Sequence, residues 1–172
     1  DPIHKAFSRK VQRHIIGREN IFFAATAPGL ERLCMSELRK ILPEPKNITC
    51  MEGGVDFSGR LTDCYRVNLQ SRVANRILMR IKCFKATNFN QLSKTLFNVP
   101  WEHYLSSNIG LTFKTTAKHS RLYHTGAVED RFRQAITHRL SLHGPDSANH
   151  LGEAGTQTIF NRILNDRVSV SL

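Results

Sequence analysis

Apolar residues in the first half of the chain recur at spacings that switch between two residues and about 3.6 residues. A period of two is typical of strands with one buried face, whereas a period near 3.6 is typical of helices with one buried stripe. The pattern predicts strand, helix, strand, strand, helix and strand over residues 21–25, 26–42, 47–51, 54–58, 61–69 and 77–84. This order is typical of the split-βαβ, ferredoxin-like arrangement of α+β proteins, with two helices on one face of four antiparallel strands.

Residues that favour helix ends and turns support these boundaries. Thr26-Ala27-Pro28 is typical of a helix start, because a hydroxyl can cap the first N–H groups and proline loses no helical donor there. Pro43 and Pro45 are expected to end that helix. Gly53-Gly54 supplies the positive φ that a tight hairpin turn requires. The last strand is expected to carry one apolar face, made of Ile77, Met79, Ile81 and Cys83.

The second half of the chain shows a different order of elements. Its patterns predict helix, strand, helix and a final hairpin over residues 89–97, 111–118, 128–140, 157–164 and 167–172. A two-residue turn at Asn165-Asp166 joins the hairpin strands, and residues 141–156 form a polar loop. We therefore expect a basic N-terminal arm, a ferredoxin-like domain and a second α/β domain over residues 1–19, 20–87 and 88–172.

Charge is the outlying bulk property of the chain. Twenty-five lysines and arginines against 14 carboxylates give its 172 residues a formal net charge of +11. Such an excess favours an anionic partner, most commonly nucleic acid or an anionic membrane surface. No apolar run reaches the roughly 18 residues of a bilayer span, and the basic N-terminus lacks the apolar core of a signal peptide. We therefore expect a cytoplasmic protein with no membrane partner.

Residue patterns that would indicate catalysis or metal binding are sparse. The eight histidines stand in no H-E-x-x-H or G-x-S-x-G setting. The four cysteines form no C-x-x-C pair, so they predict reduced, mostly buried thiols instead of a zinc site. We therefore expect neither catalytic nor metal-binding residues; a small hydrolase built on a ferredoxin-like sheet is the enzymatic alternative.

Phosphate binding is the chemistry that the sequence supports best. Lys114 and Lys118 fall on one face of a predicted strand, and basic residues fill the loop after it. The next helix is expected to start near Thr125-Gly126, where unpaired N–H groups and the helix dipole favour an anion. The candidate residues are Lys114, Lys118, His119, Arg121, His124, Thr125 and Gly126. An ordinary solvated loop is the alternative.

Arg80 and Lys82 are two further candidates. They share one face of the strand at 77–84 with apolar residues. Such a mixed face can contact RNA, or it can pack on a neighbouring domain while the charges reach solvent. The sequence leaves both interpretations open.

Several segments of the chain together carry a family resemblance. The most specific series is Gly53-Gly54-Val55, Tyr65-Arg66, Ser71-Arg72 and Asn75-Arg76, in that order. The segments are FFAATAPGLERLCMSELRKI, EGGVDFSGRLTDCYRVNLQSRVANRILMRIKCFKA and VPWEHYL. They resemble the N-terminal part of bacterial 23S ribosomal RNA guanine-N2 methyltransferases. The segments HSRLYHTGAVEDRFRQAI and TIFNRILNDRVSVSL are similar to the central helix and last strands of that family's THUMP domain.

The resemblance implies a ferredoxin-like domain followed by a THUMP RNA-binding domain. It implies that the chain docks structured RNA, specifically ribosomal RNA, for a methyltransferase domain downstream in the same chain. The chain itself would then bind no cofactor, whereas S-adenosylmethionine would serve the parent enzyme. Asn98-Val99-Pro100-Trp101 is only superficially similar to the family's Asn-Pro-Pro-aromatic motif, because it has one proline and no glycine-rich loop before it. Leu172 falls within an alternating pattern, so the THUMP domain is expected to continue beyond it.

Two other functions remain open alongside this one. The chain could be the THUMP module of a tRNA-modifying enzyme. It could also be a ribosome-associated protein-interaction domain whose charge serves only solubility.

Overall fold

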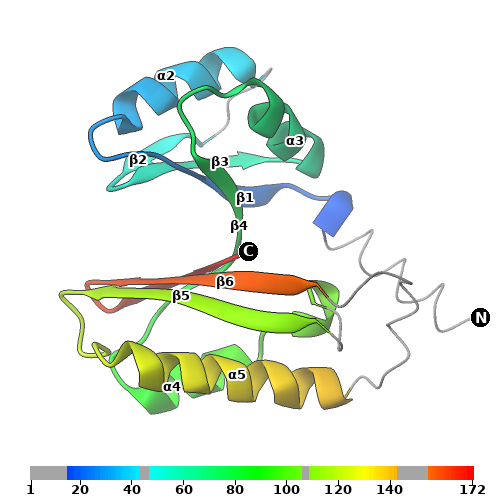
Figure 1. Cartoon of the computed structure of the whole chain (residues 1–172), viewed down its shortest axis with the longest axis vertical. Helices are drawn as coiled ribbons and strands as arrows, with labels where there is room; N and C mark the ends of the chain where they lie inside the picture. The colour runs from blue at the N-terminus through cyan, green and yellow to red at the C-terminus, as the bar shows by residue number, and fades with distance from the viewer. Residues whose placement is uncertain (1–14, 43–46, 106–108, 143–154) are drawn as a thin grey trace, which may run out of the picture. The chain divides into compact units, whose positions relative to one another are not determined.

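The computed structural model of the chain describes residues 15–42, 47–105, 109–142 and 155–172 (Figure 1). Its contacts divide the chain into two compact units, and the chain passes from one to the other between Arg80 and Ile81. The first unit comprises the described residues up to Arg80, and the second comprises those from Ile81 to Leu172. The expected division at residues 87 and 88 stays a prediction, and most of the expected basic arm lies outside the described residues.

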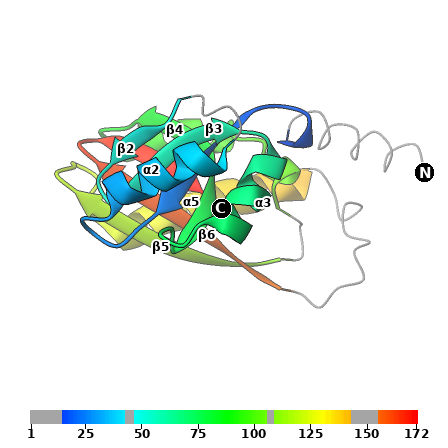
Figure 2. The same ribbon diagram turned by 90° about the horizontal axis from the view of Figure 1, so that it is seen from above.

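The first unit has the predicted order of elements, βαββαβ. These are β1 (Asn20–Ala25), α2 (Glu31–Ile41), β2 (Thr49–Met51), β3 (Gly54–Gly59), α3 (Leu61–Gln70) and the first half of β4 (Arg76–Lys85). The strands pair antiparallel in the order β2-β3-β1-β4. Helices α2 and α3 lie side by side on one face of this sheet (Figures 1 and 2). The ferredoxin-like α+β arrangement predicted from the sequence is therefore confirmed.

The core of the first unit fills the space between its sheet and its two helices. Phe22 of β1 lies opposite Phe57 of β3, and the two rings stack with centroids 5.4 Å apart. Cys34 and Leu38 of α2 pack onto this layer and are fully buried. Burial raises the pKa of the Cys34 thiol to about 11, so this cysteine acts as a small apolar side chain.

The cysteines are less buried than the sequence predicted. Cys34 and Cys64 are buried, but Cys50 and Cys83 are exposed, and all four are free thiols. Cys50 belongs to the short strand β2, whose three residues are all exposed. Cys83 belongs to the part of β4 where the apolar alternation breaks, so the expected apolar face of that strand does not extend to it.

Helix α2 begins later than predicted. Thr26-Ala27-Pro28 precedes a turn at Gly29, which has φ +90°, and the helix starts at Glu31. The Glu31 carboxylate accepts hydrogen bonds from the N–H of Gly29 at 2.9 Å and that of Gly53 at 3.1 Å. These bonds anchor the helix start to the β2–β3 turn. Gly53 has φ +80°, as the predicted hairpin requires, whereas Pro43 and Pro45 lie outside the described residues.

Glu37 of α2 binds the segment that follows α3. Its carboxylate accepts hydrogen bonds from the Ser71 hydroxyl at 2.6 Å, the Arg72 N–H at 2.9 Å and the Val73 N–H at 3.4 Å. Burial acts to raise the pKa of Glu37, but these donors outweigh it and hold the pKa below the ordinary value. The contact therefore fixes the α3–β4 connection to α2.

A pH dependence of stability follows from the Glu37 contact. Because the pKa is lowered in the folded state, Glu37 stabilises the fold above its unfolded pKa of 4.5, and this contribution is lost as pH falls through the folded value. We expect Glu37→Gln to lower the free energy of unfolding at pH 7 by about 1–2 kcal/mol. The variant should lose less stability than the wild type on acidification below pH 4.5, as measured by urea unfolding at several pH values. Parallel acid profiles of the two proteins would contradict this role.

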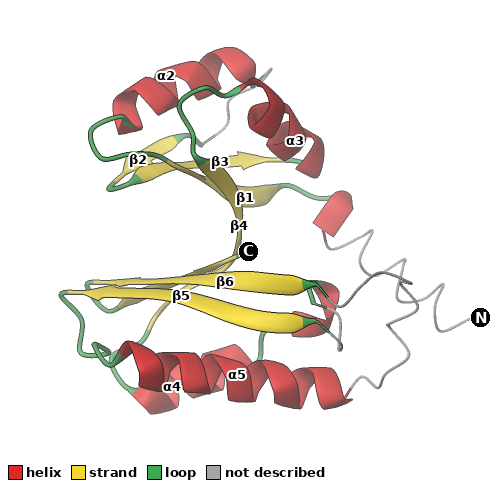
Figure 3. Ribbon diagram, viewed as in Figure 1, coloured by secondary structure: helices red, strands yellow, loops and turns green. Residues whose placement is uncertain are grey.

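The second unit contains a sheet with the helices α4 (Phe89–Phe97) and α5 (Thr125–Leu142) on one face (Figure 3). Its elements are the second half of β4, α4, the 3-10 turn η2 (Trp101–His103), β5 (Gly110–Lys118), α5, β6 (Thr156–Leu164) and β7 (Arg167–Ser171). The strand order is β4-β7-β6-β5, with β5 parallel to β6 and β6 antiparallel to β7. Asn165 and Asp166 have φ of 50° and 61°, so the predicted two-residue turn of the hairpin is confirmed.

Trp101 lies at the centre of the second unit's core. It is fully buried, its indole N–H donates to the carbonyl of Leu96 at 2.9 Å, and its ring packs edge-on against Phe132 of α5. The adjacent Glu102 is buried and makes a bidentate ion pair with Arg139, both bonds being 2.8 Å long. The Asn98–Trp101 segment thus has a packing role in this fold.

No helix among the described residues is both long and apolar enough to cross a membrane.

Candidate nucleic-acid interface

Strand β5 presents its two lysines on the exposed face, as predicted. Along β5, half-buried residues such as Phe113 alternate with exposed ones, and Lys114 and Lys118 belong to the exposed set. Leu111, Phe113 and Ala117 pack on the core beneath α5. The lysines therefore lie on the face of the sheet opposite α4 and α5.

The loop after β5 is held by the β6–β7 turn. His119 adopts φ +48°, and the next two residues turn back toward Asp166. The Ser120 hydroxyl and the Arg121 N–H each donate to the Asp166 carboxylate at 2.9 Å. Leu122 is buried and anchors the loop to the core. This leaves the side chains of His119 and Arg121 exposed at the end of the sheet.

The Asp166 carboxylate lies in the β6–β7 turn and is hydrogen-bonded to this basic loop. Its pKa is lowered first by the backbone N–H of Arg121 and then by the Ser120 hydroxyl, with further contributions from the charges of Arg121 and Lys85. Asp166 is therefore ionised at neutral pH, and its hydrogen bonds go to the loop itself. Its role is to position the loop backbone that carries Arg121.

Helix α5 starts where the sequence predicted. It begins at Thr125, and the His124 carbonyl accepts the Val128 N–H at 3.1 Å. Gly126 is exposed, and a Cβ placed on it would meet no atom within 4 Å. The first N–H groups of a helix have no partner within the helix, and the dipole there favours negative charge. This helix start and the preceding Arg121 and His124 form one basic end of the second unit.

The strand register brings a further arginine beside the lysines. Lys114 lies opposite Phe160 of β6, and its ammonium is 5.8 Å from the centre of that ring. Thr116 lies opposite Arg162 in the same parallel pairing. Sequence reasoning did not single out Arg162, because the period of a strand gives the face of a residue but not its neighbours on other strands. Only a signal for the parallel β5–β6 pairing could have identified it.

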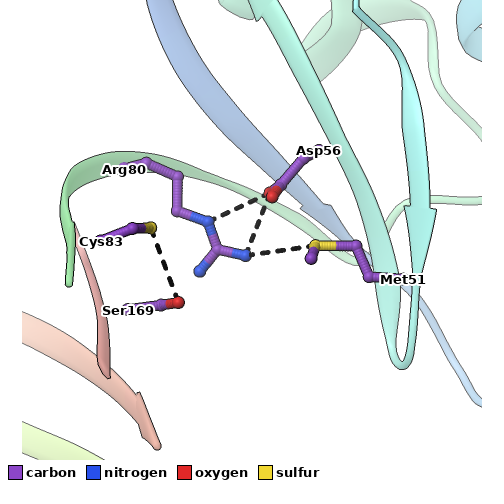
Figure 4. Close-up of polar contacts among 5 residues, drawn as sticks. All are labelled: Met51, Asp56, Arg80, Cys83 and Ser169. Carbon is purple, nitrogen blue, oxygen red and sulfur yellow. Dashed lines mark hydrogen bonds and ion pairs between the residues drawn. The ribbon is translucent and has the colours of Figure 1, made fainter. Parts of the chain in front are cut away.

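Arg80 is engaged inside the first unit (Figure 4). Its guanidinium bonds the Asp56 carboxylate at 3.0 and 3.1 Å and lies 4.3 Å from the ring centre of Phe23. It also approaches the Met51 sulfur at 4.0 Å, and its side chain is only 7% exposed. These contacts favour the packing interpretation of Arg80.

Lys82 is exposed, and the neighbouring Cys83 thiol contacts the Ser169 hydroxyl at 3.6 Å within the second unit (Figure 4). An RNA contact by Lys82 stays a prediction.

Comparison with known proteins finds relatives of this chain among RNA methyltransferases. Residues 21–78 match the family model of the RlmL ferredoxin-like domain. A ribosomal RNA large subunit methyltransferase K/L from Syntrophotalea carbinolica is 33% identical over 129 residues, which cover 70% of this chain and 18% of that protein. Its counterpart from Psychromonas ingrahamii is 33% identical over 134 residues, which cover 73% of this chain and 18% of the relative.

A solved structure shares the fold of nearly the whole chain. It comes from Listeria monocytogenes and is described as a predicted N6-adenine-specific DNA methylase. The match has a TM-score of 0.75 and 27% identity, and it covers 90% of this chain and 40% of that one. The chain thus spans less than a fifth of the two curated relatives and less than half of this solved chain. Residues 21–78 accordingly match a ferredoxin-like domain of the RlmL type, and the chain is similar to the N-terminal region of the ribosomal RNA large subunit methyltransferase K/L family.

Proposed function

We propose that this chain is the RNA-docking region of a ribosomal RNA methyltransferase. In this proposal a ferredoxin-like domain, residues 20–87, and a THUMP domain, residues 88–172, bind structured ribosomal RNA in the cytoplasm. They deliver a guanine to an S-adenosylmethionine-dependent guanine-N2 methyltransferase domain in the same polypeptide. The observation that carries the proposal is the basic end of the second unit, where Lys118 ends β5 and Arg121 lies in the loop that leads to the start of α5.

The chemistry of that end fits a phosphodiester backbone. The flexible ammonium of Lys118 and the guanidinium of Arg121 supply charge-assisted donors, and the N–H groups at Gly126 supply neutral ones. Such contacts position an RNA without reading its bases, so the choice of guanine would rest with the catalytic domain. The residues proposed for RNA contact by this end are Lys114, Lys118, His119, Arg121, His124, Thr125 and Gly126.

Salt dependence tests the proposal directly. The affinity of the chain for a labelled hairpin of large-subunit ribosomal RNA would be measured by fluorescence anisotropy between about 50 and 200 mM salt. About four phosphate contacts predict a slope of log K against log salt of roughly −3 to −4. A flat salt response, or no binding, would contradict the docking role.

Competition with other nucleic acids separates the remaining alternatives. A transfer RNA that competes better than the ribosomal hairpin would favour a tRNA-modifying enzyme. A DNA hairpin belongs in the same series, because the similar Listeria protein is described as a DNA methylase. If no nucleic acid competes and ribosomal protein binds instead, the chain is an interaction domain.

A further inference from the structure

We propose that the open face of the second unit's sheet is an additional RNA surface, one that binds the sugar-phosphate backbone of double-helical RNA. The open face is the side of β5, β6 and β7 opposite α4 and α5. Its four cationic residues are Lys114, Lys118, Arg162 and Arg167. The inference rests on the proposed RNA-docking function and adds a surface to the basic end already described.

Strand register places these four side chains on one face. On β6 the buried residues Ile159 and Ile163 pack on the core with the helices, so Arg162, of opposite parity, lies on the other side. On β7 the buried Val168 assigns Arg167 to the open face in the same way. The parallel pairing of β5 and β6 gives the lysines of β5 the same orientation.

The pairings also set the spacing of the charges. Arg162 lies opposite Thr116, midway between the two lysines of β5, and Arg167 lies opposite Leu164, the β6 partner of Lys118. Four residues along a strand span about 13 Å, and two steps between strands span about 10 Å. The cations therefore surround a patch on the order of 13 by 10 Å, large enough for several phosphate groups.

The charged residues of the three strands that form this face are all positive. Strands β5, β6 and β7 contain no aspartate or glutamate. A solvated protein surface usually intersperses both signs, because neighbouring like charges on a sheet are destabilising. A polyanion laid on the face would offset that repulsion and release its own counterions.

The side chains between the cations favour a backbone over bases. The Lys114 ammonium lies over the Phe160 ring, so this half-buried aromatic is occupied by a cation. The hydroxyls of Thr112 and Thr158 are 2.8 Å apart, and that of Thr116 is also on the face. Double-helical RNA is recognised mainly through phosphates and 2′-hydroxyls, the groups that such cations and hydroxyls bind. Single-stranded RNA is usually bound by stacking on open aromatic rings.

A paired charge reversal tests the open face. Arg162→Glu with Arg167→Glu changes two cations of the open face that are not among the residues proposed for the basic end, and the control, Arg39→Glu with Lys40→Glu, makes the same charge change on α2. We expect the first pair to weaken binding of an RNA hairpin about tenfold or more and to reduce the magnitude of its salt slope by about two. The control pair should change affinity by about twofold or less. If the reversed pair fails to fold by circular dichroism, Arg162→Gln with Arg167→Gln replaces it, with an expected loss of about threefold or more.

The outcomes distinguish this surface from the proposed function itself. If the wild-type chain binds no RNA, both proposals fail together. If the wild type binds with a steep salt slope but the two pairs of variants behave alike, the open face is overturned and the docking function stands. If a single strand of the same composition loses more affinity than the hairpin, the assignment to double-helical RNA is wrong.

Discussion

Gly54→Ala is expected to destabilise the ferredoxin-like unit by about 3 kcal/mol. A Cβ built on Gly54 lies 2.2 Å from the carbonyl oxygen of Ala24 and 2.7 Å from the ring of Phe23. The first of these atoms is backbone in the central strand β1, which pairs with β3 on one side and β4 on the other. Relief of the collision therefore requires a shift of the sheet itself, not of a flexible side chain.

The same substitution elsewhere provides the control. Gly126 meets nothing within 4 Å and belongs to the first turn of α5, where alanine is the better helix former. We expect Gly126→Ala to leave the free energy of unfolding unchanged or to raise it by up to about 1 kcal/mol. Urea denaturation followed by circular dichroism measures both variants. Equal stability of Gly54→Ala and the wild type would show that the β1–β3 pairing accommodates a methyl group at this position.

The order of elements could be predicted because each helix or strand has its own apolar period and is bounded by residues that favour turns or helix ends. Gly53 and the Asn165-Asp166 pair adopt the positive φ values that their positions in the sequence require. A helix start is less certain from sequence when a distant group competes for it. At the start of α2, the Glu31 carboxylate accepts a hydrogen bond from the N–H of Gly53, which lies in the β2–β3 turn. The Thr26 N–H donates to the carbonyl of Gly53. A local reading of Thr26-Ala27-Pro28 cannot anticipate these contacts.

The sequence predicts the candidate-site residues that lie close together in the chain, but not those that the fold brings to them from other elements. Residues from Lys114 to Gly126 are contiguous in sequence, so a strand face and a helix start were enough to find them. Arg162 joins them only through the parallel register of two strands separated by a long helix. Asp166 joins them through a turn 45 residues from Arg121, and it contributes to the site as an acid that orders the basic loop.

The packing partners of strand β4 could not be predicted from its sequence either. Its alternation predicted one apolar face, but Ile77 packs on the core of the first unit and Ile81 on that of the second. Because β4 packs on two separate cores, a single alternation of apolar and polar residues cannot predict which of its residues are buried. Arg80 lies where β4 passes from the first core to the second. The basic residues around it in the sequence gave no indication that it bonds Asp56.

Reversal of two charges at the basic end is expected to have the largest effect on RNA binding. Lys118→Glu with Arg121→Glu should weaken binding of the ribosomal RNA hairpin about a hundredfold and reduce the magnitude of the salt slope by about two. Each change removes a phosphate contact and adds a like charge beside the backbone. The loop should keep its conformation, because Asp166 is bonded by the backbone N–H of Arg121 and by Ser120.

The position of the reversed charges, not their number, should decide the result. Arg39→Glu with Lys40→Glu on α2 changes the net charge equally, and we expect it to reduce affinity by no more than about twofold. Because a glutamate in place of Arg121 would stand beside the Asp166 carboxylate, Arg121→Gln is the companion variant: it removes the contact without that repulsion, and about a fivefold loss is expected. Anisotropy titrations at matched salt measure all three, and thermal unfolding confirms that each is folded. Equal losses for the pair at the basic end and the α2 pair would mean that the chain attracts RNA by net charge alone, without a site at the end of β5.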